Sequence, residues 1–147
     1  MELVCFANDA GGVLPCLFPL VVEPCLKSGN VGTIREIILY ETETGRSEVL
    51  QFLETLRRDE RVKVMKVFEV VQTMQIVPTN CLKKLNGPDK LWEIRVRRFR
   101  FLGFYPNPSQ LVLTNAFLKQ SQATPDREIA VARQRKGMYL SVARLTK

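Results

Sequence analysis

The feature that most constrains the fold is the stretch 91–105, LWEIRVRRFRFLGFY, in which large apolar side chains alternate with charged ones. Alternation with a period of two residues is typical of a β-strand with one face in the core and one in water. The charged positions hold one acid and four arginines: Glu93, Arg95, Arg97, Arg98 and Arg100. A guanidinium group binds phosphate oxygens in pairs. The stretch therefore predicts two adjacent strands with a wet, phosphate-binding arginine face; the alternative is a face that is merely solvated.

The positive charge of the chain is concentrated with and after this stretch. The 147 residues carry a formal charge of +7. Residues 1–91 contain 11 Lys and Arg against 12 Asp and Glu, whereas residues 92–147 contain 11 against 3. Such asymmetry favours nucleic acid or another acidic partner over a small neutral ligand.

The chain has no histidine, and this excludes several kinds of site. A Ser-His or Cys-His nucleophile pair, an imidazole zinc site and an imidazole proton shuttle all need that side chain. The four cysteines form no C-x-x-C pair and are too few for a disulfide scaffold. No run of about 18 uncharged apolar residues is present for a membrane span. We expect a soluble cytoplasmic protein without metal, cofactor or membrane contact.

Residues 1–34 differ from the rest because glycine and proline interrupt every apolar run. The apolar piece 13–22 contains Pro15 and Pro19 and lacks a basic segment before it, so it is a poor secretory signal. Three interpretations stay open: an extra strand, a disordered extension, or a product of an upstream start codon. We assign residues 1–34 to an extension of uncertain order and residues 35–147 to one domain.

The first part of this domain predicts a strand and two helices. The β-branched run 35–41 predicts the strand. Ser47 is a good N-cap for a short helix whose apolar side chains are spaced for one face. Asp59 can cap a second helix, so the pair is interpreted as a helical hairpin.

The second part predicts three strands and a helix. The strands are expected at 91–96, 98–105 and 111–118. Thr124 is the expected N-cap of a basic C-terminal helix, with Pro125 at its first position. This order predicts an α+β domain: an antiparallel sheet of about four strands with an N-terminal helical hairpin and a C-terminal helix, all on one side of the sheet.

Three segments of the chain, taken together, resemble a known family. They are REIILYETETGRSEVLQFLETL, KKLNGPDKLWEIRVRRFRFLGFY and LTNAFLKQSQATPDREIAVARQRKGMYL. The most specific pieces are K-L-x-G before L-W-E-I-R, and F-x-K-x-x-x-x-T-P-x-x-E-I. In this order they are similar to the phage-derived, HigB-like branch of the RelE/ParE toxin superfamily, and the resemblance covers residues 35–140.

The resemblance implies a type II toxin with a RelE-like fold. RelE and HigB members enter the ribosomal A site and cleave mRNA, whereas ParE members poison DNA gyrase. The implied partners are the ribosome, mRNA and an antitoxin, often a helix-turn-helix protein that covers the basic groove. The implied cleavage needs no metal: a ribose 2′-hydroxyl attacks the adjacent phosphate, and cations stabilise the charge on the phosphoryl oxygens.

The resemblance also implies a set of site residues. Four residues match the catalytic cations of the groove: Lys84, Arg95, Arg100 and Lys119. Five more cations are expected to contact nucleic acid: Lys83, Arg97, Arg98, Arg133 and Lys136. For the two on the C-terminal helix the alternative is a solvated face. We expect Glu93 to pair with a strand arginine rather than act as a base, and Trp92 to belong to the core.

The chain departs from the family pattern at four positions. Asn115 stands where a histidine is common, Ala116 where glycine is frequent, Gly103 where a tyrosine is frequent, and Asn86 where some members have arginine. A lysine or tyrosine with a pKa of about 10 is a poor base at neutral pH. Two functions therefore stay open: a ribosome-dependent mRNA endonuclease, and a non-catalytic toxin that either acts on gyrase or binds RNA without cleaving it.

Overall fold

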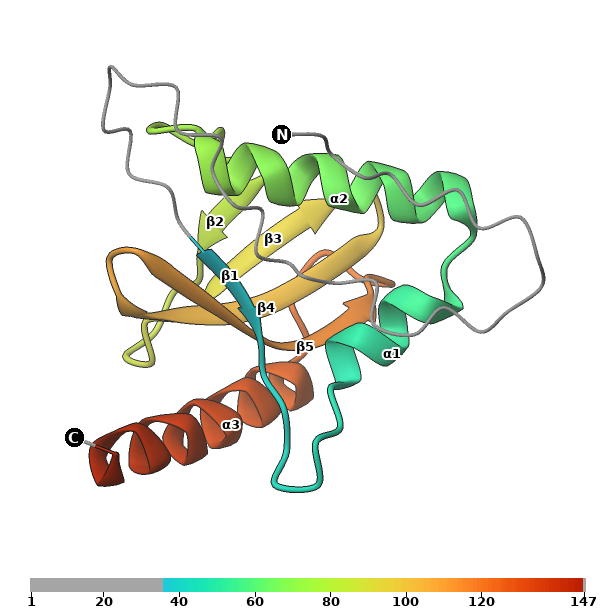
Figure 1. Ribbon diagram of the computed structural model, residues 1–147. Helices are drawn as coiled ribbons and strands as arrows, with labels where there is room; N and C mark the ends of the chain where they lie inside the picture. Colours follow the sequence, from blue (N-terminus) through green and yellow to red (C-terminus); the bar gives the residue numbers. More distant parts are fainter. Residues whose placement is uncertain (1–35, 147) are drawn as a thin grey trace, which may run out of the picture.

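The computed structural model describes residues 36–146 (Figure 1). The expected extension 1–34 lies outside these residues, as does Arg35, the expected start of the first strand. The elements in chain order are β1 (Glu36–Leu39), α1 (Glu48–Thr55), α2 (Arg58–Thr73), β2 (Leu82–Lys84), β3 (Trp92–Val96), β4 (Phe99–Asn107), β5 (Gln110–Leu118) and α3 (Asp126–Leu145). None of the helices in this part of the chain is long and apolar enough to cross a membrane.

The strands form one sheet in the order β1-β5-β4-β3-β2. Neighbours from β2 to β5 pair antiparallel, whereas β1 pairs parallel with β5. The α+β prediction is confirmed, with one strand more than expected. The additional strand is β2, which lies in a basic segment that was not assigned to a strand from the sequence. It holds three residues, too few for a period of two to be recognised.

The helices cover both faces of the sheet (Figure 1). α1 and α2 pack on one face, over side chains such as Ile94 and Phe101, and we call it the α1–α2 face. α3 packs on the other face, the α3 face, where Ala132 joins Leu102 and Phe104. The expectation that all helices lie on one side is wrong, because β4 carries apolar side chains toward both faces.

The helix starts follow the predictions in one case of three. Ser47 is the N-cap of α1, as predicted, and its hydroxyl accepts a hydrogen bond from the Leu50 backbone N–H at 3.4 Å. The N-cap of α2 is Arg57 rather than Asp59, because the Glu60 carboxylate reaches back to the Arg57 backbone N–H at 3.2 Å.

The start of α3 differs because a side chain has another use. α3 begins at Asp126, and its N-cap position is Pro125 rather than the predicted Thr124. The Thr124 hydroxyl instead donates a hydrogen bond to Glu93 Oε1 at 2.9 Å. A potential capping group thus joins the loop before α3 to the middle of β3.

The stretch 91–105 forms two strands as predicted, but its polar side chains are only partly in water. Glu93 is fully buried on β3, and Arg100 on β4 is 9% exposed. Thr124 and the following helix lie over this part of the sheet. The prediction of a wet face is therefore wrong at Glu93 and Arg100, whereas Arg97 and Arg98 are exposed. A sequence pattern identifies a polar face but not the segment that covers it.

Candidate functional site

A buried carboxylate organises the polar side chains of the α3 face. Glu93 Oε2 accepts a hydrogen bond from Arg95 Nε at 2.7 Å, and Glu93 Oε1 lies 3.8 Å from Arg100 Nε. Arg95 and Arg100 are directly opposite each other in the β3–β4 register. Two like charges at opposed positions repel each other, so Glu93 between them stabilises the pair. The expectation that Glu93 pairs with a strand arginine is confirmed.

Arg100 is held by the backbone as well as by Glu93. Its Nη1 donates to the carbonyl oxygens of Arg97 and Phe99, at 2.5 and 2.8 Å. Burial lowers the pKa of the Arg100 guanidinium; Glu93 opposes this effect and Arg95 adds to it. A guanidinium nonetheless stays protonated at neutral pH. Arg100 Nη2 donates no hydrogen bond to another described residue, and the buried Arg100 Nε also has no hydrogen-bond partner among them. Nη2 is therefore the group that Arg100 could offer to a ligand in the depression that it lines.

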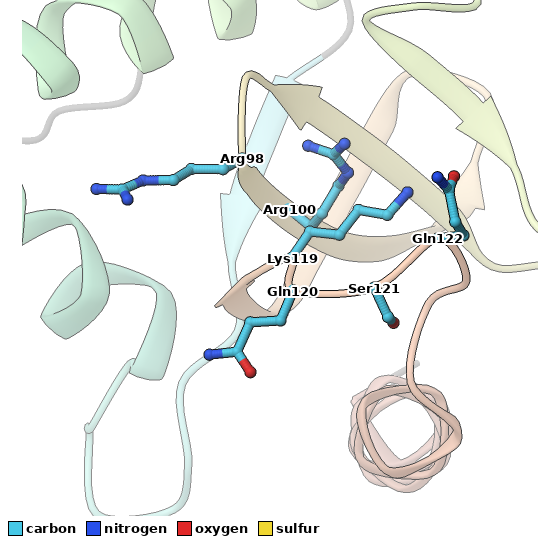
Figure 2. A pocket seen from close by; sticks show the side chains of 6 residues that line it. All are labelled: Arg98, Arg100, Lys119, Gln120, Ser121 and Gln122. Atoms are coloured by element: carbon cyan, nitrogen blue, oxygen red, sulfur yellow. The ribbon is translucent and has the colours of Figure 1, made fainter.

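Arg100 borders an open depression of about 460 Å³. Its lining residues are Arg98, Arg100, Lys119, Gln120, Ser121 and Gln122, and we call it the Arg100 depression. In Figure 2 the Lys119 side chain extends past Arg100 toward Gln122, whereas Arg98 points away from both. Arg98 instead lies 3.6 Å from the Glu60 carboxylate at the start of α2. Arg100 and Lys119 therefore line the same depression, and its lining contains no acid.

The backbone fixes the position of Lys119. Its N–H donates to the Arg98 carbonyl oxygen at 2.8 Å, which ties the segment after β5 to the β3–β4 turn. Arg97 in this turn has a positive φ of 54°, and its carbonyl accepts from Arg100. The turn and the segment after β5 thus hold the two cations side by side. Two cations that line one depression suit a phosphate group.

The four expected catalytic cations do not all lie at one site. Arg100 and Lys119 both line the depression, whereas Arg95 does not line it and only shares the Glu93 carboxylate with Arg100. Lys84 pairs with Trp92 in the β2–β3 register, and opposed residues point to the same face. Lys84 therefore lies on the α1–α2 face, away from Arg100. Its neighbour Lys83 pairs with Glu93 in the same register and therefore belongs to the α3 face.

The remaining predicted nucleic-acid contacts lie apart from the depression. Arg97 is exposed in the β3–β4 turn. Arg133 on α3 donates to the Asp89 carboxylate at 2.7 Å, and Lys136 donates to the Asp89 carbonyl oxygen. These two side chains bind the loop before β3 and are thus more than a solvated face. The roles proposed for all these cations in nucleic-acid binding stay predictions.

The positions that depart from the family pattern have structural roles. Asn115 is fully buried, and its Nδ2 donates to Glu128 Oε2 at 2.7 Å, which fastens β5 to α3. Gly103 has no room for a side chain, because a Cβ there would lie 2.4 Å from the Val112 carbonyl oxygen. Neither position could hold a proton-transfer group without rearrangement of the packing.

Sequence reasoning missed the polar residues of the segment after β5. Gln120, Ser121 and Gln122 line the depression, and Thr124 reaches Glu93. The only signal for them was their place directly after the matched Lys119. Among residues 36–146 no group of three or more His, Cys, Asp or Glu side chains is placed to hold a metal ion.

Comparison with known families gives one match. The model of the family described as phage derived protein Gp49-like (DUF891) matches residues 51–137. This range is more than half of the 147 residues and runs from α1 into α3, so it includes the whole Arg100 depression. The comparison with curated proteins gave no match.

Proposed function

Because the chain belongs to the phage-derived Gp49-like family, a RelE/HigB-like toxin family, we propose that it is the toxin of a type II toxin–antitoxin pair and that it acts on RNA. The observation that carries the proposal is that Arg100 and Lys119 line one open depression whose lining contains no acid. Its target is mRNA on the ribosome, so the protein acts in the cytoplasm. Its antitoxin is a protein with an acidic segment that covers the same cations, and a helix-turn-helix gene next to this one would support the pair.

Cleavage at this site would use the RNA's own hydroxyl group. A ribose 2′-oxygen attacks the adjacent phosphorus, the bond to the 5′-oxygen breaks, and a 2′,3′-cyclic phosphate remains. The 2′-hydroxyl loses its proton to solvent or a ribosomal group, and the departing 5′-oxygen gains one. Arg100 Nη2 and the Lys119 ammonium stabilise the charge on the phosphoryl oxygens, an electrostatic effect that is often the largest in catalysis.

A second candidate function is supported by the packing of Asn115. This residue stands where related toxins commonly have a histidine, and it is buried and hydrogen-bonded to Glu128. The lining of the depression contains cations, amides and a hydroxyl but no carboxylate or imidazole. A toxin that binds RNA or gyrase without cleaving RNA would need the cations alone. We rank it second because the cations already provide the electrostatic part of catalysis.

The two candidates are separated by expression of variants without an antitoxin. We expect wild type to arrest growth and degrade mRNA, and Arg100→Lys and Lys119→Ala to do neither. Arg58→Ala removes an exposed arginine from α2 and should behave like wild type. Growth arrest by Arg100→Lys equal to wild type would refute a role for the depression. Arrest with intact mRNA and inhibited supercoiling would favour the gyrase-directed toxin.

A further inference from the structure

A second hollow lies on the α1–α2 face, at the β2 edge of the sheet. It has a volume of about 500 Å³, within the usual range for ligand sites. Its lining residues are Val77, Thr79, Leu82, Lys83, Lys84, Trp92, Tyr105 and Pro108, and we call it the Trp92 groove. Its polar and aromatic lining consists of two cations, two aromatic rings and Thr79, with no acid. The Arg100 depression shares none of these residues.

The two aromatic rings form an angled wall. Trp92 and Tyr105 pack edge to face, with centroids 5.4 Å apart and ring planes at 90°. Both rings pack against the core, yet both keep part of their surface in solvent. The cross-strand neighbours of Trp92 are Lys84 on β2 and Gly103 on β4. Since Gly103 has no side chain, one side of the indole has no cross-strand neighbour to cover it.

The two lysines give the groove its charge. Lys83 and Lys84 are exposed, and neither forms an ion pair with any other residue in 36–146. They are adjacent on an edge strand, with Lys84 toward Trp92 and Lys83 toward the opposite face. Cations without acidic partners beside partly exposed aromatic rings are the combination that binds single-stranded nucleic acid, with bases stacked and phosphates neutralised.

We propose that the Trp92 groove binds single-stranded RNA, with a base stacked against the angled wall of Trp92 and Tyr105. One phosphate would lie at Lys84, and the next would lie at Lys83 across the strand edge. The site lies on the sheet face opposite Arg100 and needs no cleavage, so it goes beyond the proposed function. It rests on that function only in the choice of RNA over DNA. A polypeptide segment is the competing occupant, and unpaired lysines favour the polyanion.

The sequence provides a probe for this site, because Trp92 is the only tryptophan. We expect titration of the full chain with a 2′-O-methyl oligonucleotide of about ten nucleotides, which cannot be cleaved at the 2′-position, to quench the fluorescence to saturation. Tyr105→Leu should weaken binding about tenfold through loss of one stacking wall. The double variant Lys83→Ala/Lys84→Ala should reduce the slope of log affinity against log salt by about 1.4, or about 0.7 for each phosphate.

Two controls separate this proposal from the proposed function. Lys66→Ala removes an exposed lysine from α2 and should leave the titration unchanged. Lys119→Ala alters the Arg100 depression and should leave the quenching in place. Quenching that disappears in Lys119→Ala, or that is unaffected in the Lys83/Lys84 double variant, would overturn the proposal. So would RNA binding detected by anisotropy without quenching, or quenching by an antitoxin peptide but not by the oligonucleotide.

Discussion

At the scale of single residues, Glu93 determines how the cations of the α3 face are arranged. Its carboxylate contacts Arg95, Arg100 and Thr124 and is fully buried. Removal of one partner from a buried ion pair leaves an unpaired charge in the interior, which is much more costly than removal of the whole pair. Glu93 therefore supports the site and the stability of the domain through the same contacts.

This arrangement predicts a large effect of neutralising Glu93. Glu93→Gln should lower the free energy of unfolding by about 3 kcal/mol, the low end of the range for buried pairs because Arg95 is partly exposed. Urea denaturation measures the change, with the exposed Glu69→Gln on α2 as the control. Equal stability of the two variants would show that Glu93 does not hold the arginines.

The residue types of the site could be predicted, but their grouping could not. The motif pointed to Arg100 and Lys119, which do share a depression. It also pointed to Lys84, whose face depends on the register of a three-residue strand. A shift of one residue exchanges the two faces of a strand, so adjacent lysines cannot be assigned to faces from sequence alone.

At the scale of elements, the start of α2 depends on a single carboxylate. Glu60 accepts hydrogen bonds from the Arg57 backbone N–H and from the Arg57 guanidinium, and it also lies 3.6 Å from Arg98. The backbone hydrogen bond from Arg57 is the main cause that lowers the pKa of Glu60 below its ordinary value of 4.5. The stability that Glu60 gives to the start of α2 therefore depends on pH.

The sign of this coupling gives a second prediction. A carboxyl group with a lowered pKa in the folded state stabilises the fold above its unfolded pKa, and this stability is lost as pH falls through the folded pKa. We expect Glu60→Gln to be less stable than wild type at neutral pH. The two should become equally stable once the pH falls below the lowered pKa of Glu60 in the folded protein. Urea denaturation across this range tests it, and a difference that stays constant with pH would contradict it.

The pairing of β4 with β5 gives a third prediction. A Cβ at Gly103 would meet the Val112 carbonyl oxygen at 2.4 Å and Leu113 Cδ2 at 3.0 Å. We expect Gly103→Ala to cost about 2 kcal/mol through overpacking, with a lower melting temperature. Gly137→Ala is the matched control, since a Cβ on that helical residue meets nothing within 4 Å; it should be neutral or stabilising. Equal melting temperatures of Gly103→Ala and Gly137→Ala would show that β4 and β5 can move apart at Gly103.

Elements with strong local sequence patterns could be predicted, whereas the contacts between segments far apart in the chain could not. Alternation located β3 and β4, the turn signal before it located β5, and Ser47 marked the start of α1. The parallel pairing of β1 with β5 joins segments more than 70 residues apart and has no local signal. α3 packs on the face opposite α1 and α2 because β4 has apolar residues on both sides. The expectation that all helices lie on one side of the sheet overlooked these residues.

At the scale of the whole molecule, two cationic sites lie on opposite faces of one sheet. The Arg100 depression borders the β3–β4 turn, and the Trp92 groove lies at the β2 edge. Most of the excess positive charge is in residues 92–147, which contain the strands and the helix around the depression. Such a distribution favours a polyanion that contacts more than one surface of the protein.

The most direct test of the central claim is a map of mRNA 5′ ends after expression without an antitoxin. The account predicts new 5′ ends inside coding sequences with wild type and with Arg58→Ala, and none with Arg100→Lys. Thermal melts of the purified proteins would show that Arg100→Lys is folded. Growth arrest by wild type with mRNA 5′ ends unchanged from uninduced cells would contradict the claim that the Arg100 depression cleaves RNA.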